Sequence, residues 1–175
     1  QVKDAFLRMA QGRHVGKQVI TLPEQAPPQA IRGDGTYLIL GAFGGIGQRL
    51  QHWLVKQGAR SLLLVGRQHP QADNAVAQQA EAWQAQGIEV VALGWDDLDK
   101  ALAALPADRP LRGVIHAAGV LRDQHIGAIE SDDLAPVLQA KWGVEKKLAQ
   151  LRQRSPECWR HLDFYVVFSS IAAGL

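Results

Sequence analysis

The sequence predicts an α/β domain built on a doubly wound parallel sheet. Between residue 34 and the end of the chain, short runs that are apolar throughout alternate with helical stretches. Strands that are apolar along their whole length are buried on both faces, and helices between them require parallel crossovers. This alternation is typical of an open sheet with helices on both sides.

Five apolar runs are the predicted strands, at residues 37–40, 61–65, 88–93, 113–116 and 164–168. Helices are predicted from the turn after residue 40 to about residue 57, at 72–86, at 98–105, and from Asp133 to about residue 154. We expect Asp133 to be the N-cap of the last helix, because Pro136 then lies in the first turn, where its missing N–H costs nothing.

Composition divides the chain into three parts. Residues 1–22 contain an amphipathic helix and a short strand at 17–22, and the prolines that follow indicate an extended linker at 23–33. Residues 34–175 are then the α/β domain. The chain begins without Met and stops directly after a strand-like run, so we expect a piece of a longer protein, with the domain truncated at its C-terminus.

Composition also excludes several function classes. A net charge of +2, with basic and acidic residues interspersed, gives no reason to expect a nucleic-acid or membrane partner. The single cysteine, Cys158, excludes an internal disulfide, and with only His161 close by it makes no structural metal site. There is no membrane-spanning apolar run and no signal-peptide pattern, so we expect a cytoplasmic protein without a metal.

A glycine-rich turn follows the first predicted strand and opens the first helix. A pyrophosphate must approach main-chain N–H groups at a helix N-terminus, so side chains there have to be absent. Between a strand and a helix, such a turn predicts a Rossmann-like dinucleotide-binding unit, and a merely flexible turn is the alternative. The expected cofactor-binding residues of the turn are Gly41, Phe43, Gly44, Gly45, Ile46 and Gly47.

The end of the second strand indicates which dinucleotide binds. An NAD site usually has an acidic residue there, but this strand ends Val65-Gly66-Arg67, with Arg67 twenty positions beyond Gly47. A guanidinium can pair with the 2′-phosphate of NADPH, and a solvated surface arginine is the alternative. Asp96, after the third strand, is a candidate acceptor for the adenine amino group, or else part of a helix N-cap cluster.

Five ordered motifs in residues 34–175 resemble one family. They are Gly41 to Gly47, Val65-Gly66-Arg67, Gly113 to Leu121, Val137 to Lys141, and Val167-Phe168-Ser169-Ser170. The series resembles the ketoreductase domain of polyketide synthases and animal-type fatty acid synthases, within the short-chain dehydrogenase/reductase superfamily. Residues 1–22 resemble the C-terminal helix and strand of an enoylreductase domain, which precedes the ketoreductase in such synthases.

The resemblance implies that NADPH reduces the β-keto group of an acyl chain carried by an acyl carrier protein. Ser170 matches the catalytic Ser, and Lys141 matches the lysine that holds the nicotinamide ribose. Ala117, Ala118 and Gly119 match the cofactor-binding segment after the fourth strand. The catalytic Tyr of the family falls about a dozen residues beyond Ser170, outside the chain, so we expect the chain as it stands to bind cofactor without turnover.

The sequence also departs from the family pattern. Leu40 replaces a Thr whose hydroxyl ties the glycine turn together, and the register after Lys141 leaves Lys146 and Lys147 as alternatives. Asp123 fits the subtype that forms the D-alcohol, although Arg122 replaces a preceding Asp, and a plain polar loop is equally compatible. Open alternatives are an inactive or structural Rossmann domain of a synthase, a methyltransferase and a sugar epimerase.

Overall fold

The structure is a computed structural model that describes residues 7–12, 31–67, 75–122 and 125–169. The chain forms two compact units, Gln1–Ala30 and Ile31–Leu175. In the first unit, residues 7–10 are helical, and Gly12 follows with a φ of 63°. The predicted strand at 17–22 and most of the 23–33 linker lie outside the described residues. The assignment of residues 1–22 to an enoylreductase domain therefore stays a prediction.

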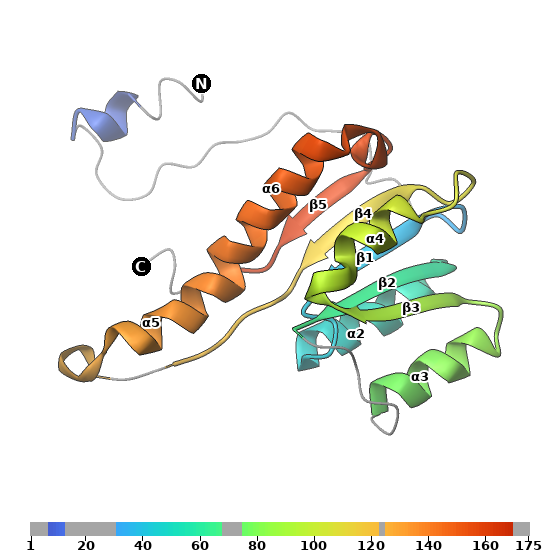
Figure 1. Cartoon of the computed structure of the whole chain (residues 1–175), viewed down its shortest axis with the longest axis horizontal. Coiled ribbons are helices and arrows are strands. Elements are labelled where there is room, and N and C mark those ends of the chain that lie inside the picture. Colours follow the sequence, from blue (N-terminus) through green and yellow to red (C-terminus); the bar gives the residue numbers. More distant parts are fainter. Residues whose placement is uncertain (1–6, 13–30, 68–74, 123–124, 170–175) are drawn as a thin grey trace. The chain divides into compact units, whose positions relative to one another are not determined.

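A parallel sheet is the centre of the second unit (Figure 1). Its strands are β1 (Thr36–Leu40), β2 (Ser61–Gly66), β3 (Glu89–Gly94), β4 (Leu111–His116) and β5 (Phe164–Val167). They lie in the order β3-β2-β1-β4-β5, and every neighbouring pair is parallel. The strand order reverses between β1 and β4, and in open α/β sheets ligands bind outside the carboxyl ends of the strands at such a point. The doubly wound prediction is confirmed.

Helices cover both faces of the sheet, as Figure 1 shows. On one face, α2 (Gly45–Lys56) and α3 (Ala75–Gln84) contribute Leu54 and Trp83 to the core. On the other face, α4 (Leu98–Ala103) and α6 (Val144–Arg154) contribute Leu102 and Leu148. The remaining elements are η1 (Trp95–Asp97), η2 (Ile126–Ala128), α5 (Ser131–Leu138), the π-helical η3 (Gln139–Gly143) and η4 (Pro156–Trp159).

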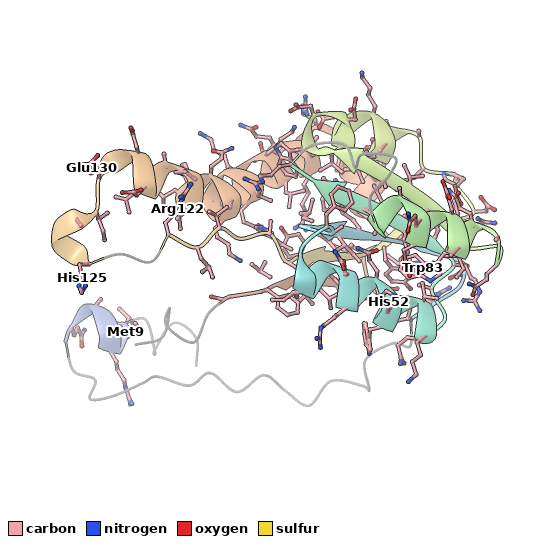
Figure 2. The ribbon with its side chains drawn as sticks, turned by 90° about the horizontal axis from the view of Figure 1, so that it is seen from below. Met9, His52, Trp83, Arg122, His125 and Glu130 are labelled. Carbon is pink, nitrogen blue, oxygen red and sulfur yellow. The ribbon has the colours of Figure 1, made fainter. Side chains whose placement is uncertain are left out.

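The predicted N-cap of the last long helix was wrong. Helix α5 begins at Ser131 with Glu130, which is labelled in Figure 2, as its N-cap. The Asp133 carboxylate is at the third helical position and accepts a hydrogen bond from the Glu130 N–H at 3.2 Å. An acidic side chain at this position commonly reaches back to the cap residue in this way. Pro136 consequently lies beyond the first turn.

The prediction that all strands are buried on both faces was wrong for the two outer strands. In β5, Tyr165, Val166 and Val167 are 37% to 45% exposed, and in β3 Val91 is 45% exposed. Both strands have a single strand neighbour among the described residues, β4 and β2 respectively. The central strands β1, β2 and β4 are almost completely buried, which agrees with their apolar sequences.

Candidate functional site: the carboxyl ends of the central strands

The glycine turn is packed against the segment that follows β4. Gly41 has a φ of 77°, a conformation that residues with a side chain rarely adopt. A Cβ atom at Gly41 would lie 2.5 Å from the Ala118 nitrogen and 2.8 Å from the Ala117 carbonyl carbon. Two of the predicted cofactor-binding segments, the turn and Ala117-Ala118-Gly119, are therefore in direct backbone contact.

The start of α2 presents main-chain donors to solvent. Gly44 is the N-cap, and Gly44, Gly45 and Ile46 are all exposed. The first N–H groups of a helix have no acceptor within the helix and lie at the positive end of its dipole. A Cβ atom at Gly47 would lie only 2.2 Å from the Gly41 carbonyl oxygen, so this glycine allows the helix to begin directly against the turn.

Backbone bonds and one buried side chain brace the turn, although Leu40 offers no hydroxyl. The N–H groups of Gly41 and Ala42 donate to the Val65 carbonyl at 2.9 and 3.1 Å. The Gln51 amide, 2% exposed, donates to the Ala42 carbonyl at 2.6 Å. Sequence reasoning missed Gln51, whose signal is a polar residue on the buried face of α2, four positions after Gly47.

The predicted adenosine-side residues lie at neighbouring strand ends. Arg67 is exposed and directly follows Gly66, the last residue of β2. Gly66 pairs with Gly94, the last residue of β3, so the two strands end level with each other. Asp96 is exposed two residues beyond Gly94, in η1. The N-cap position of α4 belongs to Asp97, not to Asp96.

Lys141 lies where β4 and β5 end. Its ammonium group donates to the Phe168 carbonyl at 2.5 Å, and a Cβ atom at Gly119 would lie 3.9 Å from the same nitrogen. The two alternative lysines point elsewhere. The Lys147 ammonium lies 4.7 Å from the centre of the Trp95 ring, and that of Lys146 lies 5.2 Å from the centre of the Trp142 ring. Of these three lysines, Lys141 is the one at the ends of β4 and β5, whereas Lys147 lies beside Trp95, which follows β3.

A partly buried hydrogen-bond network that the sequence did not reveal centres on His116, beside the helical turn that contains Lys141. His116, the last residue of β4, is fully buried, with Nδ1 2.5 Å from Glu145 Oε1 and Nε2 3.1 Å from the Ala140 carbonyl. Tyr165 of β5 donates its hydroxyl to Glu145 Oε2 at 2.7 Å. Partial burial, and then the hydrogen bond to Glu145, raise the pKa of Tyr165 above its usual value.

Two predicted site residues, Ser170 and Asp123, lie outside the described residues. Phe168 lies two positions before Ser170, and its N–H donates a hydrogen bond to the His116 carbonyl at 2.9 Å. Within the described ranges, no group of three or more His, Cys, Asp or Glu residues is arranged to hold a metal ion. Nor does any helix in those ranges combine the length and the apolar character needed to cross a membrane.

The sheet order and the glycine turn define a Rossmann-like α/β protein. The KR domain family matches residues 35–175, and the chain belongs to that family. It is 39% identical to polyketide synthase GfsB of Streptomyces halstedii over 98% of its length, and 34% identical to a highly reducing polyketide synthase of Aspergillus terreus over all of it. The chain spans only 3% and 7% of these two relatives.

Solved ketoreductases have the same fold. A-type ketoreductases from a modular polyketide synthase match with a TM-score of 0.71 and 30% identity, over 90% of this chain and 33% of theirs. The first ketoreductase of the tylosin polyketide synthase matches with a TM-score of 0.65 and 37% identity, over 79% of this chain and 30% of its own. The recognition of a ketoreductase domain from its motifs is confirmed, and the methyltransferase and epimerase alternatives are set aside.

Proposed function

We propose that this chain is the cofactor-binding part of a ketoreductase that reduces the β-keto group of an acyl chain to a β-hydroxy group, with NADPH as reductant. The observation that carries the proposal is the position of Lys141. Its ammonium group lies beside Gly119 and on the carbonyl of Phe168, at the same end of the sheet as the glycine turn. A cation at this place can hold the sugar of a dinucleotide that enters through the turn.

The shape of the turn supports the cofactor. Gly44 and Gly45 carry no side chain at the exposed start of α2, where a pyrophosphate would approach, and Gly41 and Gly47 allow the turn to pack closely against the backbone around it. The first turn of α2 contains no acidic residue that would repel phosphate. Arg67 would pair with the 2′-phosphate, and Asp96 would accept a hydrogen bond from the adenine amino group.

NADPH, when bound, supplies the hydride. The chain's own residues would then orient the reacting groups: Lys141 would hold the nicotinamide ribose, and Ser170 would donate a hydrogen bond to the keto oxygen, where negative charge develops. The ammonium of Lys141 would also lower the pKa of a nearby phenol and so favour its use as the proton donor. The resemblance implies that a Tyr following Ser170 provides this phenol.

The length of the relatives supports a multidomain setting, which we propose lies in the cytoplasm. Because the chain spans a small fraction of each synthase that it resembles, we propose that it works among other synthase domains, including an enoylreductase. The substrate would be an acyl chain on the phosphopantetheine arm of an acyl carrier protein.

The test uses the synthase that contains this domain, with a β-ketoacyl thioester as substrate. We expect Lys141→Ala to abolish substrate-dependent NADPH oxidation, so that the β-keto product accumulates. Lys146→Ala, which changes an exposed lysine five residues further on in α6, is the matched control and is expected to retain the β-hydroxy product. Unchanged formation of the β-hydroxy product in Lys141→Ala would contradict the proposal.

A further inference from the structure

Both ring nitrogens of His116 have a partner inside the protein. His116 is the last residue of β4, and its side chain is fully buried. Nε2 lies 3.1 Å from the Ala140 carbonyl oxygen, which can only accept a hydrogen bond. Nε2 must therefore carry a proton and donate it to this carbonyl. The other nitrogen, Nδ1, faces the Glu145 carboxylate at 2.5 Å.

The Ala140 carbonyl belongs to the peptide unit that ends at the nitrogen of Lys141. In an α-helix, the N–H of Val144 would donate to this carbonyl. Here the Val144 N–H instead bonds to the carbonyls of Gln139 and Lys141, because residues 139–143 form a π-helical turn. The π-helix is rare and is found mostly as single turns at functional sites. The π-helical turn leaves the Ala140 carbonyl without the Val144 N–H, and the His116 side chain donates to it instead.

We propose that His116 is a positioning residue for Lys141. Its Nε2–H bond fixes the plane of the Ala140–Lys141 peptide, and this plane sets the direction in which the lysine side chain leaves η3. The backbone of His116 also positions the residue that Lys141 contacts. The His116 carbonyl accepts a hydrogen bond from the Phe168 N–H, and the Phe168 carbonyl accepts one from the Lys141 ammonium. One residue therefore holds both the lysine and its acceptor.

Glu145 and Tyr165 complete the arrangement by orienting the imidazole. Glu145 lies one helical turn after Lys141, and its two oxygens contact His116 Nδ1 and the Tyr165 hydroxyl. A carboxylate on one nitrogen of a histidine fixes the ring orientation and the role of the other nitrogen. The network thus joins β4, β5 and α6 behind the lysine. The expected effect of His116 on reduction rests on the proposed function of Lys141. The expected effect of His116 on the position of Lys141 does not.

Two substitutions at His116 distinguish the role of Nε2 from that of Nδ1. In His116→Gln the side-chain amide can reach the position of Nε2 and still donate to Ala140, whereas in His116→Asn it reaches only the position of Nδ1. The readout is the rate at which a small amine-acylating reagent modifies Lys141, followed by mass spectrometry without cofactor and referred to Lys100, an exposed lysine on α4. A hydrogen bond of the Lys141 ammonium should slow its acylation by about tenfold, the factor that corresponds to the free energy of a hydrogen bond to a charged group.

We expect Lys141 to react about tenfold faster in His116→Asn than in the parent chain, and at nearly the parent rate in His116→Gln. Equal acylation rates in the two variants would overturn the proposal. If His116 had only a structural role, both substitutions would lower the melting temperature, but the acylation rate of Lys141 would be the same in both. If His116→Asn does not fold, Glu145→Leu is used, since it leaves His116 in place and removes the group that orients it. A rise of several-fold is expected there, and the parent rate would contradict the proposal.

A second readout uses the synthase. We expect His116→Asn to lower kcat for ketoreduction with little change in KM for the thioester, and His116→Gln to restore most of the loss. Equal loss of kcat in both variants would contradict the role of the Nε2 donor. Because the acylation experiment contains no NADPH, failure of the proposed ketoreductase function would leave the conclusion about the position of Lys141 intact.

Discussion

A Cβ atom placed on Gly41 would lie 2.5 Å from the main-chain nitrogen of Ala118. The two residues follow β1 and β4, the neighbouring strands between which the sheet order reverses. Their contact brings together the turn and the segment after β4, the two segments that we propose bind the cofactor. A side chain at Gly41 would have to move a backbone segment, and the first prediction follows from this.

Gly41→Ala is expected to lower both stability and NADPH affinity. The positive φ alone costs about 1 kcal/mol for a residue with a Cβ, and the contact with Ala118 adds to it. Urea unfolding should therefore show a loss of more than about 2 kcal/mol. Gly87→Ala is the matched control, because Gly87 has the same φ of 77° but nothing within 4 Å of its Cβ position. An equal loss in both variants would show that the Ala118 contact contributes nothing.

Gly45→Ala is expected to reduce NADPH binding without destabilising the protein. A Cβ atom at Gly45 would meet nothing within 4 Å, and alanine favours a helix over glycine by about 1 kcal/mol. The methyl group would nevertheless stand at the exposed start of α2, where the pyrophosphate is expected. Calorimetric titration with NADPH should show weaker binding while the melting temperature is unchanged or higher. Parent affinity would place the phosphate elsewhere.

Arg67→Ala is expected to weaken NADPH binding by about tenfold and to leave NADH binding unchanged, since the guanidinium would pair only with the 2′-phosphate. Titration with both nucleotides measures the difference. Arg60→Ala serves as a control, because Arg60 precedes β2 whereas Arg67 follows it. Equal affinity of the parent chain for the two nucleotides would refute the assignment of Arg67.

Gln51→Leu is expected to destabilise the domain by about 1–3 kcal/mol, because the change removes a buried donor to the Ala42 carbonyl. Gln48→Leu is the comparison. The Gln48 amide donates to the Phe43 carbonyl at 3.1 Å, but this side chain is exposed, so a change within about 0.5 kcal/mol is expected. Urea unfolding of both variants tests the difference, and similar losses would mean that burial of Gln51 is not what braces the turn.

Stability is expected to fall at alkaline pH through Tyr165. Burial and the bond to Glu145 raise the pKa of Tyr165 in the folded state above the unfolded value of about 10. The folded state then binds the proton more tightly, so this stabilisation is complete below pH 10 and decreases as the pH rises beyond it. Burial also raises the pKa of Tyr37, the other tyrosine of the chain.

Unfolding free energies measured between neutral pH and about pH 11 should therefore decrease less in Tyr165→Phe than in the parent chain. Tyr37→Phe provides the comparison, because it leaves the bond between Tyr165 and Glu145 intact. A parent chain and a Tyr165→Phe variant with parallel pH profiles would show that Tyr165 is not held in its protonated form.

Local patterns determined the elements of this fold. The central strands are mostly apolar, and the glycine turn is a pattern of seven consecutive residues, so both can be recognised without knowing what lies nearby in space. The burial of the two outer strands was harder to predict. An apolar run has the same composition at the edge of a sheet as in its middle, and only the strand order reveals that Val91 and Val167 are partly exposed.

The sequence by itself determined the parallel sheet, the glycine turn and, through five ordered motifs, the family. The tertiary structure decided which of three lysines lies at the ends of β4 and β5, that Gln51 braces the turn, and that Glu145 joins His116 to Tyr165. The physical reason is range. A turn or a strand depends on neighbours along the chain, whereas the hydrogen bond between Tyr165 and Glu145 joins residues 20 positions apart, and no local pattern encodes such a pairing.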